Sequence, residues 1–104
     1  MTFPYKINFD QIDWDSPMAG VRHKHIDHGG QRIRLVEYSR DLPPHWCEKG
    51  HCGYLISGKM EIEYPDRTIV YNQGDGIFIP DGPAHKHKGR VLSEQALVFF
   101  IEKA

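Results

Sequence analysis

Short stretches in which apolar and polar residues alternate with a period of two most strongly constrain the fold of this chain. In residues 59–64, for example, Met60, Ile62 and Tyr64 alternate with charged side chains. This is the pattern of a strand with one buried face. The same pattern predicts strands at residues 5–9, 32–38, 67–71, 76–80 and 96–102, and at the more highly charged residues 21–26. The chain is therefore expected to consist mainly of β-strands.

Glycine and proline separate these stretches. Ten Gly and seven Pro divide the chain into segments that are too short for a set of packed helices. A helical turn at residues 93–96 is not favoured, because a β-rich run follows it. Several short strands separated by turns predict an all-β sandwich or barrel. A length of 104 residues suits one domain, residues 1–104, with no internal repeat or linker.

The charge of the chain narrows the range of partners. A formal net charge of -1 gives no basic face for the phosphates of nucleic acid. No apolar run is long enough to span a membrane, and the N-terminal residues do not have the pattern of a signal peptide. We therefore expect a cytoplasmic protein whose partner is a small molecule, with no nucleic acid and no membrane among its partners.

Metal-binding side chains gather in two segments. His45 and Cys47 are two residues apart, so on a strand they would project from the same face. His51 follows Gly50, which permits a sharp turn back toward the same point. His85 comes from a distant segment, after a turn rich in Pro and Gly. Together these residues could form one metal site.

The spacing in both segments resembles the motifs of the cupin family of small β-barrels. The first cupin motif has H-x-H, three or four residues, E, six residues and G; residues 45–58 keep this spacing and change two of the four residue types. The second motif has G, five residues, P-x-G, two residues and H, and residues 74–85 match it completely. The resemblance implies an all-β, single-domain cupin-type jelly-roll β-barrel. Carried over residue by residue, it implies the metal ligands His45, Cys47, His51 and His85.

The nature of these ligands bears on the identity of the metal. A cysteine thiolate is a softer ligand than the carboxylate of the family motif, which favours one zinc or nickel ion per chain. In the alternative, Cys47 stays protonated as a small buried hydrophobe, and His45, His51 and His85 form a facial set with open positions. That set resembles the iron site of thiol dioxygenase-type cupins, so iron is the other candidate.

Other residues near the motifs have two interpretations each. His87 would face the same cavity as His85 on a continuing strand, as a proton carrier, or it is an exposed histidine. Cys52 should point to the face opposite His51, so a disulfide with Cys47 is not expected. Arg32 and Arg34 could bind an anionic substrate or belong to a solvated face.

Three functions follow from these residues. The first is a metal-binding cupin that binds or transforms a small organic molecule, with the metal as a Lewis acid, for instance in isomerase or lyase chemistry. The second is an iron-dependent dioxygenase that uses three histidines. The third is a non-enzymatic binding or sensor module with a structural metal. The family resemblance also implies a homodimer, for which an apolar face with Tyr5, Ile7 and Phe9 is a candidate contact.

Overall fold

The computed structural model describes residues 3–104, which form nine strands and two short 3-10 helices. The elements are η1 (Phe9–Gln11), β1 (Asp15–Met18), β2 (Val21–His28), β3 (Gln31–Ser39), β4 (His51–Ser57), β5 (Lys59–Glu63), β6 (Thr68–Asn72), β7 (Gly76–Ile79), η2 (Pro83–His85), β8 (Lys88–Val91) and β9 (Gln95–Lys103). The fold is therefore all-β, as the alternating pattern predicts. Among residues 3–104, no helix is both long and apolar enough to span a bilayer.

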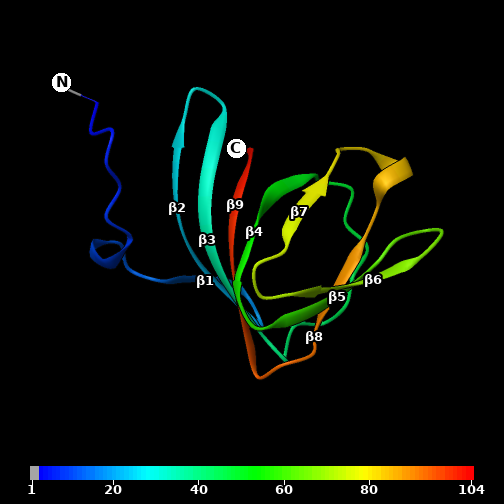
Figure 1. Cartoon of the computed structure of the whole chain (residues 1–104). Helices are drawn as coiled ribbons and strands as arrows, with labels where there is room; N and C mark the ends of the chain where they lie inside the picture. Colours follow the sequence, from blue (N-terminus) through cyan, green and yellow to red (C-terminus); the bar gives the residue numbers. More distant parts are fainter. Residues whose placement is uncertain (1–2) are drawn as a thin grey trace.

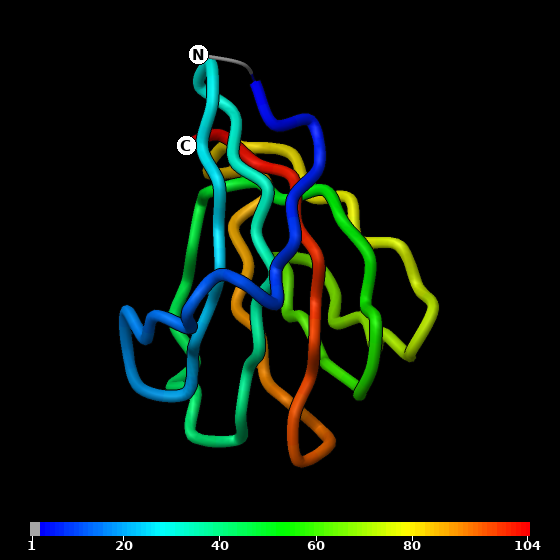
Figure 2. Tube along the Cα trace, turned by 90° about the vertical axis from the view of Figure 1, so that its left-hand side faces the viewer, coloured from blue at the N-terminus to red at the C-terminus, as the bar shows by residue number. Residues whose placement is uncertain are grey.

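The strands form two antiparallel sheets. The larger sheet has the order β1-β2-β3-β9-β4-β7, and the smaller has the order β6-β5-β8. Figure 1 shows the smaller sheet with β5, β6 and β8 set at an angle across the curved larger sheet. Figure 2 shows the C-terminal strand running between segments from the first and the middle parts of the chain. The architecture is a jelly roll, and its interior lies between the two sheets.

Alternation along β9 explains the composition of the interior. Ala96, Val98 and Phe100 are buried, and the residues between them are less buried or exposed. The next residue in the inward row is Glu102, which is also buried. The other core residues come from both sheets: Val21, Val36, Leu55, Met60, Ile62, Tyr71, Ile77, Ile79 and Val91. The inward row of β9 is therefore apolar as far as Phe100 and ends with the charged side chain of Glu102.

Two of the sequence expectations need correction. Residues 5–9 do not form a strand, because Tyr5 has a φ of 56° and the side chain of Asn8 caps the short helix η1. Phe9 instead packs edge-to-face against Phe99 of β9, with ring centroids 6.3 Å apart. The residues around His45 also lack a regular strand, since only Cys47 makes an isolated bridge there. This segment is therefore joined to its neighbour by an isolated bridge at Cys47 instead of a continuous ladder.

Candidate metal centre

Three side chains that can bind a metal converge between the sheets. The Sγ of Cys47 and one ring nitrogen each of His51 and His87 all lie within 4.8 Å of one another. His87 is buried, and Cys47 and His51 are partly buried. Two of the four predicted ligands, Cys47 and His51, are therefore brought together, and His87 is the third member of the group.

Backbone pairing positions Cys47 beside His87. The N–H of Cys47 donates to the carbonyl of His87 at 2.8 Å, and the N–H of His87 donates to the carbonyl of Cys47 at 2.9 Å. Two residues that exchange both bonds in an antiparallel bridge have side chains on the same side of the ribbon. The bridge alone therefore brings together the thiol and the imidazole, which are far apart in the sequence.

Two further contacts hold the connecting segments in place. The N–H of Gly50 donates to Oδ1 of Asp81 at 2.7 Å, and the N–H of Gly82 donates to the carbonyl of Glu48 at 3.0 Å. A Cβ on Gly50 would lie 2.4 Å from the carbonyl oxygen of Ile79. The two motif segments therefore approach too closely at Gly50 for any larger residue.

His51 is oriented by a buried carboxylate. Its Nδ1 lies 2.5 Å from Oε2 of Glu102, whose side chain is fully buried, and its ring stacks on Phe100 with centroids 4.5 Å apart. The Nδ1–H therefore donates to Glu102 and leaves Nε2 free to act as a ligand. A metal-binding histidine commonly donates its other ring N–H to a carboxylate in this way.

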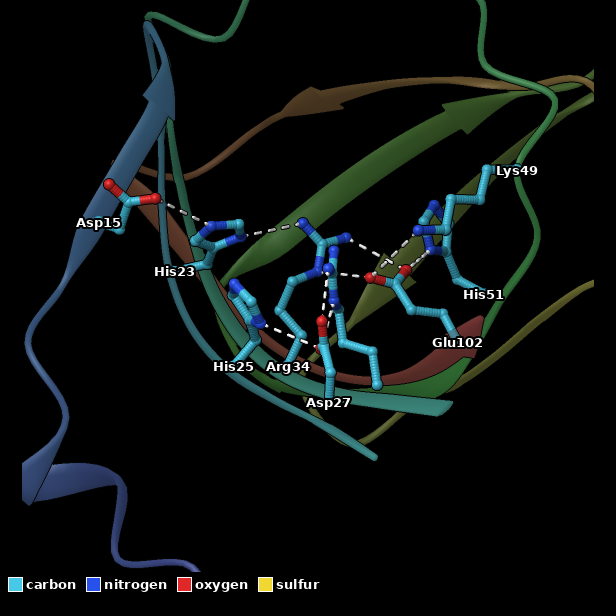
Figure 3. Close-up of polar contacts among 9 residues, drawn as sticks. Asp15, His23, His25, Asp27, Arg34, Lys49, His51 and Glu102 are labelled. Carbon is cyan, nitrogen blue, oxygen red and sulfur yellow. Dashed lines mark hydrogen bonds and ion pairs between the residues drawn. The ribbon is translucent and has the colours of Figure 1, made fainter. Parts of the chain in front are cut away.

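Glu102 also belongs to a longer chain of charged groups, shown in Figure 3. Arg34 Nε lies 2.8 Å from Oε1 of Glu102 as an ion pair, and an Arg34 terminal nitrogen donates to Oε2 at 3.3 Å. Another terminal nitrogen of Arg34 lies 3.4 Å from Nδ1 of His23, and Nε2 of His23 lies 3.5 Å from Asp15. Burial raises the pKa of Glu102, but the hydrogen bond from His51 and the charge of Arg34 outweigh it and lower this pKa overall. Glu102 is thus held as a carboxylate.

The environment of His87 favours a neutral ring. Its Nδ1 lies 3.0 Å from the carbonyl oxygen of His85 and donates to it, which leaves Nε2 as the atom that is free to bind a metal. Burial lowers the pKa of His87, and the nearby His51 and His45 lower it further, against the opposing effect of the bond to His85. A neutral imidazole is the form that binds a metal.

The other two predicted ligands lie outside the group of three. His45 is exposed and lines the same cavity, with Nδ1 3.3 Å from the carbonyl oxygen of Pro43. His85 is exposed on η2 and lines a second pocket together with Tyr64 and Tyr71. The short helix turns His85 away from the interior and brings in His87 two residues later. The role of His85 as a ligand remains a prediction that this geometry does not support.

A cavity of about 260 Å³ adjoins the three side chains. Apolar residues from both sheets form much of its wall, among them Met60, Ile62, Ile77, Ile79 and Phe100. The cavity also includes Arg32, Arg34, Lys49 and Lys88. Residues from the start, the middle and the end of the chain therefore line this cavity.

The donor set suits a transition metal. Ligands of a tetrahedral zinc ion lie about 2.0–2.3 Å from it and so about 3.5 Å from each other. The limit of 4.8 Å on the three ligand atoms is compatible with that arrangement after small side-chain rotations. A thiolate and two neutral imidazoles, one of them backed by Glu102, match the preferences of zinc or nickel more closely than those of manganese.

The sequence did not point to Glu102, and it suggested His87 as a proton carrier and not as a candidate ligand. Glu102 continues the inward row of Ala96, Val98 and Phe100, so an acid in a strand with three apolar inward residues was the available signal. For His87 the signal was weaker, because the second motif already had a histidine at residue 85. Only the bridge to Cys47 distinguishes the two histidines.

Comparison with known proteins agrees with this architecture. The family model described as "Cupin domain" matches residues 33–101, whereas no curated protein matches the chain. Among solved structures, KdgF from Halomonas sp. has a TM-score of 0.68 at 21% identity and covers 91% of each chain.

Two other solved structures have the same fold. The polyketide cyclase RemF from Streptomyces resistomycificus has a TM-score of 0.75 at 22% identity and covers 94% of this chain and 78% of its own. FeII HppE has a TM-score of 0.74 at 10% identity and covers 92% of this chain and 58% of its own. The family match over residues 33–101 and these likenesses lead to one conclusion: the chain belongs to the cupin family.

Proposed function

We propose that Cys47, His51 and His87 hold one divalent transition metal and that the protein binds or transforms a small organic molecule beside it. The convergence of the three ligand atoms on the cavity wall carries this proposal. His45 lines the same cavity and is the candidate for a fourth ligand, as the cupin resemblance implies. Zinc or nickel is the favoured ion because of the thiolate.

The residues around the site have separate roles in this proposal. The metal supplies Lewis acidity toward a carbonyl or hydroxyl of the bound molecule. Glu102 keeps the N–H of His51 at Nδ1, so that Nε2 always faces the site. The apolar wall excludes water and strengthens electrostatic interactions within the cavity. His87 acts as a ligand in this arrangement, which leaves the proton-carrier role that the sequence suggested for it unassigned.

Metal analysis of the full-length protein, purified without a histidine tag, tests the proposal. We expect about one equivalent of zinc or nickel in the wild type and a loss of most of it in Cys47→Ser and His51→Asn. His28→Asn, at the exposed end of β2, is the matched control and should keep the metal. Iron that is retained in Cys47→Ser would instead support the dioxygenase with three histidine ligands. A metal with no exchangeable position would support the non-enzymatic module.

Two further expectations belong to the same proposal. We propose a homodimer, because Tyr54, Phe78 and Ile101 are large apolar side chains exposed on neighbouring strands of the larger sheet. Light scattering of the purified protein measures this directly, and a monomer at micromolar concentration would contradict it. We also propose a cytoplasmic location, which fractionation of cells that express the protein would test.

A further inference from the structure

The cavity beside the candidate metal centre contains more positive than negative side chains. Four cationic residues line it: Arg32, Arg34, Lys49 and Lys88. Within residues 3–104, one carboxylate lines the same cavity, that of Glu102. Because an apolar wall solvates charge poorly, each cation should have a partner nearby. The four cations differ in their partners, and Lys49 differs from the other three.

The two arginines are already compensated. Arg32 makes a two-pronged contact with Asp27, with Nε at 2.7 Å and a terminal nitrogen at 2.9 Å from the two carboxylate oxygens. Arg34 forms the ion pair with Glu102 at 2.8 Å, and the side chain of Glu102 is fully buried. A carboxylate at this distance holds the guanidinium in place and offsets its charge.

Lys88 also has partners of its own. Its Nζ lies 3.7 Å from Oε1 of Glu63 and 4.9 Å from the centre of the Trp46 ring. A carboxylate and an aromatic face both attract an ammonium group. Lys88 is therefore held at the rim of the cavity, between the smaller sheet and Trp46.

Lys49 differs from the other three cations. Its nearest acid among the described residues is Glu102, at 3.9 Å from Nζ, and Glu102 is already compensated by Arg34. The Lys49 side chain is 40% exposed and lines the cavity. Figure 3 shows Lys49 and His51 approaching Glu102 from the same side. Lys49 thus shares the carboxylate of Glu102 with Arg34 and with the candidate metal ligand His51, and its partly exposed charge remains at the cavity.

We propose that Lys49 binds the carboxylate of the cavity's ligand, which makes the ligand a small organic monoanion with an apolar body. The apolar wall of the cavity suits the apolar body of such a ligand, and the cavity volume of about 260 Å³ suits a small ligand. The proposal rests on the proposed function because it concerns the same cavity, and it names the class of molecule that lies beside the metal.

Calorimetric titration with matched anionic and neutral probes tests this inference. The probes are benzoate with benzamide, and hexanoate with hexanamide, so that each pair shares its apolar body and differs in charge. They are titrated into the zinc-loaded and the metal-free full chain. We expect at least one anion to bind about tenfold or more tightly than its amide, in both forms of the protein.

Variants assign the effect to one residue. Lys49→Gln should reduce the preference for the anion to less than about threefold while leaving the metal content unchanged. Lys59→Gln removes the same charge from the exposed side of β5 and should keep the full preference. Lys49→Arg, which restores the charge, should recover most of the preference.

The outcomes separate this inference from the proposed metal site. Equal binding of anion and amide, equal loss in Lys49→Gln and Lys59→Gln, or no binding of either anion at millimolar concentration would overturn the role of Lys49. None of these results would alter the metal content measured in the Cys47 and His51 variants. Conversely, a wild type that binds no metal in the elemental analysis but still prefers the anion through Lys49 would contradict the metal proposal and keep this one.

Discussion

Nδ1 of His51 lies 2.5 Å from Oε2 of the fully buried Glu102, although the two residues are 51 positions apart in the sequence. The contact joins the first residue of β4 to the inward row of β9 and fixes which nitrogen of His51 faces the cavity. It also links the candidate metal centre to Arg34 and so to the six-stranded sheet. Glu102 therefore has both a structural role and a role in positioning His51.

Glu102→Gln should weaken metal binding without removing any ligand. The amide keeps the volume but not the charge, so the hydrogen bond to His51 weakens and Arg34 loses its counter-ion. Loss of such a partner typically costs about 10–100-fold in metal affinity. Competition with a chelator measures it. Glu61→Gln, which removes a carboxylate that pairs with Arg90 on the other sheet, is the control and should leave the affinity unchanged.

His87→Asn and His85→Asn distinguish the last residue of the second motif, His85, from the histidine two residues after it. Because His87 belongs to the group of three and His85 lies in a different pocket, only His87→Asn should lose most of the metal. Elemental analysis of both variants, with circular dichroism to confirm folding, gives the answer. Loss of metal in His85→Asn alone would return the site to the ligand set implied by the sequence motif.

Leu55→Ala should destabilise the fold through its core. Leu55 has 0% exposure and lies between the two sheets, so truncation leaves a cavity that costs about 2–5 kcal/mol. Urea denaturation measures the loss. Ile56→Ala, the next residue of β4, faces outward with 37% exposure and should cost clearly less. Similar losses for both variants would be inconsistent with the assigned faces of β4.

Gly53→Ala should be poorly tolerated for a different reason. A Cβ at residue 53 would lie 1.9 Å from the carbonyl oxygen of Phe99, so β4 and β9 would have to separate. We expect a loss of at least about 1–3 kcal/mol and weaker metal binding, since His51 lies on the same strand. Gly76→Ala is the control, because its nearest contact would be 3.9 Å away. A thermal melt that is unchanged in Gly53→Ala would contradict the close approach of the strands.

The pair between Asp27 and Arg32 predicts a pH-dependent contribution to stability. The hydrogen bonds from Arg32 lower the pKa of Asp27 well below its ordinary value of 3.8. A carboxyl group whose pKa is lower in the folded state stabilises the fold at pH values above its ordinary pKa. This stabilisation is lost as the pH falls through the folded-state pKa. Asp27 is partly exposed, so the effect should be less than about 1 kcal/mol at pH 7.

Asp27→Asn is the variant that measures this contribution. It should lower the free energy of unfolding near neutral pH, and the difference from wild type should shrink in acid. Asp13→Asn, at an exposed residue with no ion pair among those described, should show no such trend. A difference that stays constant from neutral to acidic pH would show that the effect of Asp27→Asn does not come from its charge.

Local patterns in the sequence were enough to predict most of the strands. Residues 32–38, 59–64, 67–71, 76–80 and 96–102 alternate clearly, and each coincides with a strand of the structure. Residues 5–9 alternate as well, but the positive φ of Tyr5 and the cap of Asn8 give a turn there. A short alternating run predicts a strand only if a neighbouring strand is available, and no local pattern carries that information.

What the sequence by itself determined is the strand pattern, the two cupin-like motifs and the presence of Cys47 and His51 in one of them, because spacing and periodicity are local properties. The choice of His87 over His85 depends on a bridge between residues 47 and 87. The support from Glu102 depends on the pairing of β9 with β4. Both are contacts between distant parts of the chain, so only the tertiary structure could decide them.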